Sequence, residues 1–566
     1  MVEPTVTPLQ AQAQIDLRIT KLFETIRALK EERNTHSIAV RLPPEILTHI
    51  FLYVVHRIYE SRSLPLEQLS IPHVCRYWRT VAIRSQEFWQ FQPIGQNGLL
   101  WPPEMIERAG GRPPYIWGRV GDGDLSWSPS VFPPLARAVS SARALHIEMS
   151  TEMTTATGIN FLESFPVVSL PNLESLTLYS EDSVYPIIIS TKFLPDGAPN
   201  LKKLVIDNFD WEWDSISSLL PSSLTSLVLH GHARWDEDCV EALQRLTSLQ
   251  YLEITDTREP QYHGDPGSRL PRQSPTIKMP HLRDLYLQGD PLYIVNLILE
   301  FDIPLSTSID ITARHASHEV SEDEDYPEFN LLFKWIHLHF EKLDKAGMPM
   351  SALKITNSRL DEENVVGLYF FNSPNPFPDS PCSSTNAKPV LEITFTKYYA
   401  SREKQWVASY FEAAFWRIMP HLPLRNIRLL DLYGLPVMEC PQIAFSGLTG
   451  VKTLWIYSDE ALSLLYALIP RSKTKGFDSS DEDDDSDVSD DEIPLPALES
   501  LFLPNPFFSE RTTRILDFVV HRTKCRRPIT KLSLANRQCV PDALLKDLCE
   551  RVPVVRFDTD EKEGTA

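Results

Sequence analysis

One short pattern, Leu-x-x-Leu-x-Leu, recurs along most of this chain of 566 residues. Successive clear copies lie 28, 23, 25 and 33 residues apart, counted between their first leucines, which are Leu173, Leu201, Leu224, Leu249 and Leu282. Later copies occupy 424–434, 448–458, 495–505 and 529–536, and weaker ones occur at 142–150 and between 351 and 398. One such unit cannot bury its apolar face alone, whereas stacked units share a continuous core. The pattern therefore predicts a stack of similar units.

Each copy alternates apolar and variable residues, which predicts a strand with one buried face, and segments such as 236–246 are typical of covering helices. The spacing resembles that of leucine-rich repeats, which are 20–29 residues long. The asparagine usual three residues after the last leucine is absent, and Glu181, Phe209 and His232 stand there. We therefore expect turns closed by other means, in an irregular leucine-rich-repeat solenoid over 136–557.

The variable strand positions predict a concave binding face that is rich in aromatic side chains. Exposed Tyr and Trp are favoured at the centres of protein interfaces, so this face is expected to bind a protein. The alternative is that loops fold over these side chains and bury them. The predicted partner-binding residues are Tyr179, Asp207, His230, Tyr251, Tyr286, Tyr433, Trp455 and Tyr457.

Residues 38–92 form a second kind of region, which is too apolar for its size. Pro43 and Pro44 suit the start of a helix, and apolar residues then follow at almost every position from Ile46 to Val55. A second stripe at helical spacing runs from 71 to 82. A unit of about 50 residues buries too little surface to be stable without a staple or a partner. No metal motif or disulfide pattern supplies a staple, so another surface must cover this unit.

The segments "LPPEILTHIF", "VCRYWRTVA" and "EFW" of this region resemble the F-box, and the degenerate repeats resemble those of leucine-rich F-box proteins common in fungi. The resemblance implies a Skp-family adaptor as partner and, through it, a cullin–RING ubiquitin ligase. Some of the apolar residues of these segments, Trp78 and Phe51 above all, could instead form the module's own core. The residues implied to face the adaptor are Leu42, Pro43, Ile46, Leu47, Ile50, Val74, Cys75, Trp78 and Trp89.

Three further segments complete the predicted organisation. Residues 11–35 carry apolar side chains at a 4-3-4-3 spacing, which predicts an amphipathic helix that packs on its own protein or forms a short coiled coil. Residues 96–135 are rich in Pro, Gly and Trp and predict an irregular connector. Residues 472–494 contain a dense acidic run, which predicts a disordered insertion. The expected fold is thus α/β: a small all-α module followed by a solenoid.

Composition narrows the function. Lys and Arg number 55 against 76 Asp and Glu, a formal charge of −21, which argues against nucleic acid as partner. The seven cysteines lack a CxxC pair, and no signal peptide or membrane span is visible, so we expect a cytoplasmic or nuclear protein without a membrane partner. No nucleophile, phosphate-binding or metalloprotease motif occurs, so no enzyme, catalytic residue, metal or cofactor is expected.

These features favour one function over a close alternative. The chain is expected to be the substrate-recognition subunit of an SCF-type ligase, with the F-box on the adaptor and the repeats on an unknown protein target. Catalysis then comes from positioning, because holding a target lysine near the transfer machinery turns a bimolecular encounter into a local one. The alternative is a repeat scaffold that binds the adaptor or other partners without delivering ubiquitin.

Overall fold

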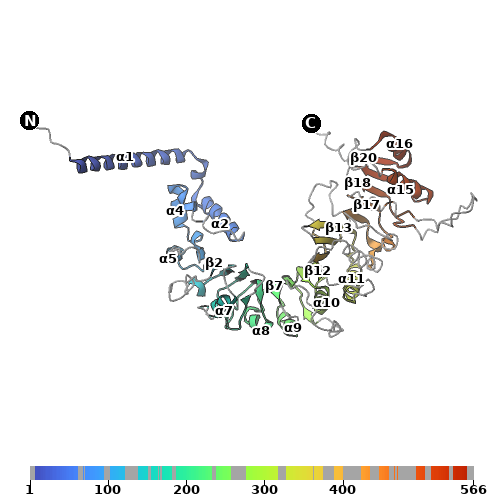
Figure 1. Cartoon of the computed structure of the whole chain (residues 1–566), viewed down its shortest axis with the longest axis horizontal. Coiled ribbons are helices and arrows are strands. Elements are labelled where there is room, and N and C mark those ends of the chain that lie inside the picture. Colours follow the sequence, from blue (N-terminus) through green and yellow to red (C-terminus); the bar gives the residue numbers. More distant parts are fainter. Residues whose placement is uncertain are drawn as a thin grey trace, which may run out of the picture. The chain divides into compact units, whose positions relative to one another are not determined.

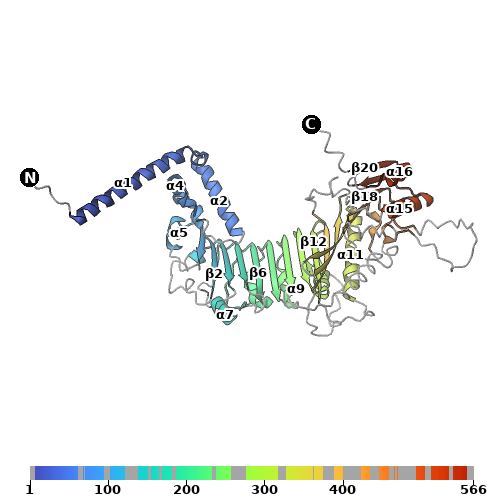
Figure 2. The same ribbon diagram turned by 45° about the horizontal axis from the view of Figure 1, so that its top comes forward.

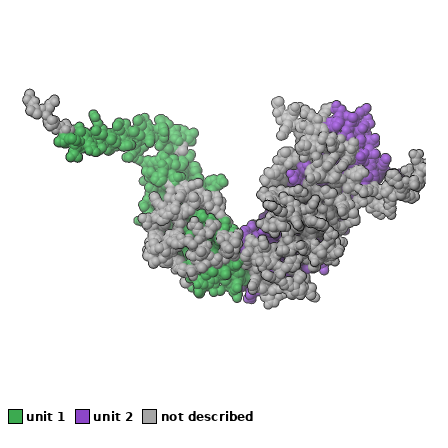
Figure 3. All heavy atoms as spheres, viewed as in Figure 1, with its two compact units in different colours: residues 1–224 green, residues 225–566 purple. Residues whose placement is uncertain are grey.

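A computed structural model shows two compact units, residues 1–224 and residues 225–566 (Figures 1 and 3). Both contain strands and helices, which confirms the mixed α/β class and a large, mostly parallel sheet. The predicted insertion at 472–494 lies almost wholly outside the residues that the structure describes. Those residues are 7–60, 68, 70–94, 102–121, 138–150, 155–163, 165, 169–181, 187–232, 237–256, 276–316, 327–360, 363–373, 388–398, 422–433, 445–457, 465, 468–469, 493–503, 512–534 and 540–557.

The first unit begins with helices. Thr7 caps the long first helix through a reciprocal pair of hydrogen bonds with Gln10, and Pro8 occupies its first turn. The segment expected to be helical, 11–35, lies within this helix. The helices and single helical turns of this part are α1 (Pro8–Thr35), η1 (Ile38–Val40), α2 (Pro44–Glu60), η2 (Ile71–His73), α4 (Arg76–Arg84), η3 (Phe88–Gln90) and α5 (Pro102–Arg108).

A parallel sheet follows in the same unit. Strands β1, β2, β3, β4 and β6 are neighbours in that order, and the short β5 pairs with β6 (Figure 2). Part of the predicted 96–135 connector is therefore regular, because α5 and β2 lie in it. The remaining elements of this unit are β1 (Phe91–Ile94), β2 (Tyr115–Val120), β3 (Ala144–Met149), α7 (Thr155–Glu163), β4 (Ser175–Ser180), β5 (Ile187–Ile188), β6 (Lys203–Asp210), α8 (Trp213–Ile216) and η4 (Ser217–Leu219).

The second unit starts with a similar parallel sheet, in which β7, β8, β10, β12 and β15 are neighbours. A separate pair joins β9 to β11. Its first elements are β7 (Ser226–His232), α9 (Glu237–Gln244), β8 (Tyr251–Asp256), β9 (Ile277–Lys278), β10 (Asp284–Gly289), α10 (Pro291–Glu300), β11 (Phe301–Asp302), β12 (Ser308–Ala316) and α11 (Pro327–Lys345).

The order of strands then departs from the order of the chain. β15 joins β12 directly, β14 is antiparallel to both β15 and β13, and β13 continues in parallel to β16, β17, β18, β19 and β20. The repeat pattern does not predict this antiparallel excursion. The elements concerned are β13 (Ala352–Leu360), β14 (Glu363–Phe371), β15 (Leu391–Tyr398), η6 (Leu424–Asn426), β16 (Leu429–Tyr433), β17 (Thr453–Ile456), β18 (Ser500–Leu503), α15 (Thr512–Lys524), β19 (Lys531–Leu534), α16 (Asp542–Arg551) and β20 (Val554–Phe557).

The leucines of the repeated pattern form the core. In β4, β8 and β10 every second residue is buried, as the alternation predicts, and Leu176, Leu252 and Leu285 have no exposed surface. Polar side chains that stand just before a strand donate hydrogen bonds to a carbonyl group of the preceding repeat and so tie consecutive repeats together. These contacts are Asn200 to Pro171, Ser223 to Leu201, Thr307 to Leu282 and Thr530 to Glu499.

One buried cation holds the last strands of the second unit in place. The Arg522 guanidinium of α15 is 1% exposed and donates hydrogen bonds to the carbonyl groups of Pro494, Leu495 and Leu498 at 3.1–3.3 Å. Burial lowers its pKa to about 10. Because several carbonyl oxygens solvate the charge, Arg522 is a structural residue rather than part of an exposed basic patch.

Candidate binding surfaces

The N-terminal module has a filled core of its own. Leu47, Phe51 and Val55 share one face of α2 and are almost fully buried. The Phe51 ring lies 5.1 Å from the Trp78 ring and 6.0 Å from the Phe88 ring. The cluster extends past the predicted boundary at residue 92, because α5 contributes to it. Its buried members are Leu47, Phe51, Val55, Ile71, Val81, Ala82, Phe88, Trp89, Phe91, Met105 and Ala109.

A second apolar stripe of α2 remains uncovered. Ile46, Ile50, Tyr53 and Val54 follow at positions i, i+4, i+7 and i+8, which places them on one side of the helix. Ile46 is 47% exposed and Ile50 is 40% exposed. We call these four side chains the docking face. Val74, which precedes α4, is also exposed. The module therefore presents aliphatic surface beyond the needs of its own core.

The nine residues predicted to face the adaptor divide into three groups. Ile46, Ile50, Val74 and Pro43 are exposed, while Leu42, Cys75 and Trp78 are partly buried. Leu47 and Trp89 belong to the core, which corrects their assignment to a partner-facing surface. The reason is that apolar residues occupy more than half of the circumference of α2, so the sequence alone does not show which side faces inward.

Three of these residues take part in hydrogen bonds that stabilise the module itself. The Trp89 indole N–H donates to the carbonyl oxygen of Ala82 at 2.8 Å, which satisfies the polar atom of a buried ring. The Cys75 Sγ accepts the backbone N–H of Trp78 at 3.4 Å and so caps the start of α4. The carbonyl of Leu42 accepts the Tyr77 hydroxyl at 2.8 Å, which ties the start of α2 to α4.

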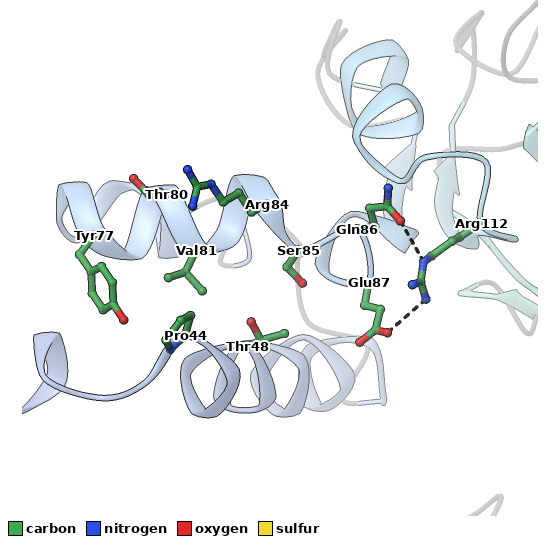
Figure 4. Close-up of a pocket in the computed structure, with 10 residues that line it drawn as sticks. All are labelled: Pro44, Thr48, Tyr77, Thr80, Val81, Arg84, Ser85, Gln86, Glu87 and Arg112. Atoms are coloured by element: carbon green, nitrogen blue, oxygen red, sulfur yellow. Dashed lines mark hydrogen bonds and ion pairs between the residues drawn. The ribbon is translucent and has the colours of Figure 1, made fainter.

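A groove of about 390 Å³ lies between α2 and α4 (Figure 4). Pro44 and Thr48 line it from α2, and these positions lie about 160° around the helix from Ile46 and Ile50. At one end Arg112 bridges Gln86 and Glu87, at 3.3 and 3.1 Å. The groove is thus separate from the docking face.

The second unit has an open face, formed by the side chains that alternate with the buried leucines. Strand register places one residue of each strand in a continuous central row. Four carboxyl groups and four aromatic rings stand in this row. In spatial order the row reads Glu253, Tyr286, Asp310, Glu392, Tyr369, Lys354, Asp431, Trp455 and Phe502.

Glu253 is held at one end of the row. Its carboxylate accepts the Tyr251 hydroxyl at 2.5 Å and lies 2.9 Å from the His230 Nε2. Burial raises the pKa of Tyr251, and the hydrogen bond to Glu253 raises it further. Tyr251 therefore stays protonated as a donor. The three side chains form a fixed polar cluster on β7 and β8.

Two carboxyl groups stand side by side at the centre of the row. Asp310 of β12 and Glu392 of β15 are register partners. Burial raises the pKa of Asp310 to about 6, with a contribution from Glu253, and burial together with the charge of Asp310 raises the pKa of Glu392 to about 7. Lys388 forms an ion pair with Asp284 and lies 5.4 Å from the Tyr286 ring. Near neutral pH this part of the face carries partly protonated carboxyl groups.

Asp431 occupies a third environment, among aromatic rings. It is 2% exposed, and among the described residues its Oδ1 accepts no hydrogen bond. Burial raises its pKa to about 7, although the charge of Lys354 opposes the shift. The Trp455 ring lies 4.9 Å from the Phe502 ring on the neighbouring strand. This carboxyl group is therefore protonated over much of the acidic range.

The eight predicted partner-binding residues lie on strands or directly after them, and they differ in exposure. In the second unit Tyr433 is 53% exposed, and His230, Tyr251, Tyr286 and Tyr457 are partly exposed. Trp455 is buried, as the alternative interpretation expected for the whole set. In the first unit Tyr179 and Asp207 are partly exposed register partners on β4 and β6. The prediction missed Asp310, Glu392, Lys388 and Tyr369, because none of them lies in a clear copy of the leucine pattern.

Two kinds of site are not found in the segments described. Across them, no three His, Cys, Asp or Glu side chains come together as ligands for a metal ion. None of the helices described combines the length and the apolar character needed to cross a bilayer. No protein-family model and no curated protein matches this chain.

Proposed function

We propose that this chain is the substrate receptor of a cullin–RING ubiquitin ligase. In this proposal the N-terminal module is an F-box that docks onto a Skp-family adaptor, and the repeats form a leucine-rich solenoid whose open face holds a target protein. The chain makes or breaks no bond itself. It accelerates transfer by holding a target lysine close to the ligase machinery.

The observation that carries the proposal is the docking face. The module buries eleven residues in its own core and still exposes Ile46, Ile50, Tyr53 and Val54 on one side of α2. Contiguous exposed apolar surface marks an interaction site, and a stable interface needs only about 800 Å² from each partner. The F-box resemblance of the same segment names the adaptor as the occupant.

The open face supports the second half of the proposal. At one end of this face His230, Tyr251 and Glu253 are fixed by contacts with each other, so they lose little entropy when a partner binds. Tyr251 and Tyr286 have ring centroids 5.4 Å apart on neighbouring strands. Paired aromatic side chains of this kind are typical centres of protein interfaces.

The test uses purified full-length chain and a purified Skp-family adaptor. Replacing Ile46 and Ile50 with Asp introduces two charges into the docking face without touching the core, so adaptor binding is expected to fall at least about 100-fold. Ile188→Asp is the matched control, since Ile188 is 48% exposed on β5, outside the module. Failure of the wild-type chain to bind, or equal binding by the Asp variants, would show that the module is not an F-box.

A second measurement separates the receptor from a scaffold. A receptor carries the cullin along with the adaptor during purification, whereas a scaffold retains the adaptor alone. Proteins that bind both the wild-type chain and the Ile46/Ile50 variant are target candidates. We expect Tyr286→Ala to release them, because Tyr286 is a partly exposed ring of the open face that pairs with Tyr251.

A further inference from the structure

No part of the chain that the structure describes covers the apolar side chains of helix α1. The helix extends over 28 residues, and none of them is buried (Figures 1 and 2). Eight of its apolar side chains are at least 44% exposed. An isolated helix gains little stability from propensity alone and normally depends on packing of its apolar face. A second surface is therefore needed to cover α1.

The exposed side chains fall into a heptad pattern. Ile15, Leu22 and Leu29 occupy the d positions, and Ile19 and Ile26 occupy the a positions between them. Phe23 flanks this seam at an e position. Leu17 is the exception, because it lies on the back of the helix. A seam with this spacing fits a partner helix rather than a sheet or a flat surface.

The module's own contact with α1 leaves the seam free. Arg76 of α4 pairs with Glu31 at 2.8 Å. Glu31 occupies an f position, which lies on the opposite side of the helix from a and d. The F-box-like module therefore attaches to the back of α1, and its presence does not compete with a partner on the seam.

The charges beside the seam identify the partner and its direction. The e positions carry Asp16 and Lys30, and the g positions carry Arg18 and Glu32. Within the described residues none of these four makes an ion pair. We propose that α1 pairs with α1 of a second copy of this chain in an antiparallel coiled coil.

The antiparallel register pairs every one of these charges with an opposite one. When Ile19 of one copy faces Leu29 of the other, Leu22 faces Ile26, and the four central layers are apolar, while Ile15 faces Arg33 at each end. Flanking e positions then face e positions, so Asp16 lies opposite Lys30 of the second copy. Flanking g positions face g positions in the same way, and each contact occurs twice by symmetry.

A parallel pair lacks this complementarity. There g positions face e positions of the next heptad, so Arg18 lies opposite Phe23, and Thr25 lies opposite Lys30. No pair of opposite charges forms. Charge pattern at e and g positions sets partner choice and orientation, so the antiparallel homodimer is the arrangement that this sequence favours.

The experiment measures the mass of the full-length chain, without adaptor, by sedimentation over a range of concentrations. Wild-type protein is expected to dimerise, and Leu22→Lys is expected to be monomeric. Asp16→Lys alone and Lys30→Asp alone each create two repulsive pairs and should raise the dissociation constant about fivefold or more. The double swap Asp16→Lys with Lys30→Asp recreates both attractive pairs and should restore the wild-type constant.

Each outcome decides the proposal. Dimerisation that survives Leu22→Lys places the interface elsewhere, and a wild-type chain that stays monomeric or pairs only with another protein overturns the homodimer. A double swap as weak as the single variants overturns the antiparallel orientation. Because no residue of α1 is buried, these variants leave folding intact, which urea unfolding verifies. The result is independent of adaptor binding.

Discussion

The N-terminal module and the sheet of the second unit both fill their cores with aliphatic side chains, but they differ in what they leave exposed. The module exposes Ile46, Ile50 and Val54, which cannot form hydrogen bonds. The open face exposes tyrosines and carboxyl groups that already contact each other, such as Tyr251 with Glu253. An aliphatic surface favours a long-lived complex, whereas a polar and aromatic surface can be hydrated and can bind partners repeatedly.

In the proposed receptor, this difference suits two interfaces of unlike lifetime, one for the adaptor and one for the target. A receptor must keep its adaptor while it exchanges targets. Exposed apolar side chains serve the first requirement, because dissociation of the adaptor would return their apolar surface to water, which is unfavourable. Carboxyl groups with raised pKa values serve the second, because their charge and their partners can change.

The largest expected effect lies in the core of the module. Phe51→Ala removes a ring that contacts both Trp78 and Phe88, and should lower the local free energy of unfolding by about 3–5 kcal/mol. Ile46→Ala, one turn earlier but on the docking face, should lower it by less than about 1 kcal/mol. Amide hydrogen exchange of α2 peptides measures both. Similar losses for the two variants would mean that the docking face is core.

A smaller effect, of opposite sign, is expected at Asp431. Its pKa of about 7 in the folded chain, against 3.8 ordinarily, means that the folded state keeps a proton that the unfolded state loses. The stabilisation is present below about pH 4 and is lost as the pH rises to about 7. Asp431→Asn should therefore stabilise the second unit by at most about 4 kcal/mol at pH 8 and change little at pH 4.

The matched control for Asp431 is Asp302→Asn. Asp302 is an exposed aspartate of β11 in the same unit, and it lies outside the open face. Urea unfolding at pH 4 and pH 8 supplies the comparison. A stabilisation of Asp431→Asn that is equal at both pH values would contradict a titration of this group.

The smallest expected effect concerns the pair at the centre of the open face. Asp310→Asn and Glu392→Gln should each stabilise the unit at pH 8, but by less than about 1 kcal/mol, because water partly screens both groups. The double variant should gain less than the sum, since each substitution already removes the repulsion between the two. Additive gains in urea unfolding would show that the two carboxyl groups do not interact.

Much of the sheet is readable from the sequence, because the leucine pattern marks its buried face. The copies at 170–180, 246–256 and 279–289 contain β4, β8 and β10, and even the weak copy at 142–150 contains β3. The pattern could not reveal β14, since Glu363–Phe371 carries apolar residues without the repeat spacing. Its antiparallel pairing depends on neighbours that are distant in sequence.

The binding surfaces were less predictable, for two physical reasons. Leu47 and Ile46 are adjacent apolar residues of one helix, and only the position of α4 decides which one faces inward. Asp310 and Glu392 are register partners although they lie far apart in the sequence. The sequence alone therefore gives no sign that the two carboxyl groups repel each other. Arg522 is a similar case, because its carbonyl acceptors belong to a loop before β18.

The place of β15 in the sheet has a consequence for synthesis. Strands β8, β10 and β12 can each join the edge formed by the preceding strand of this sheet as soon as they leave the ribosome. β13 and β14 cannot do so, because β15, which follows them in the chain, separates them from β12. Their native edge does not exist until residue 398 has emerged. A nascent chain that is halted after β14 therefore carries β13 and β14 without a sheet edge to join. The sheet grows again only when β15 is complete, and β13, β14 and β15 then join it together.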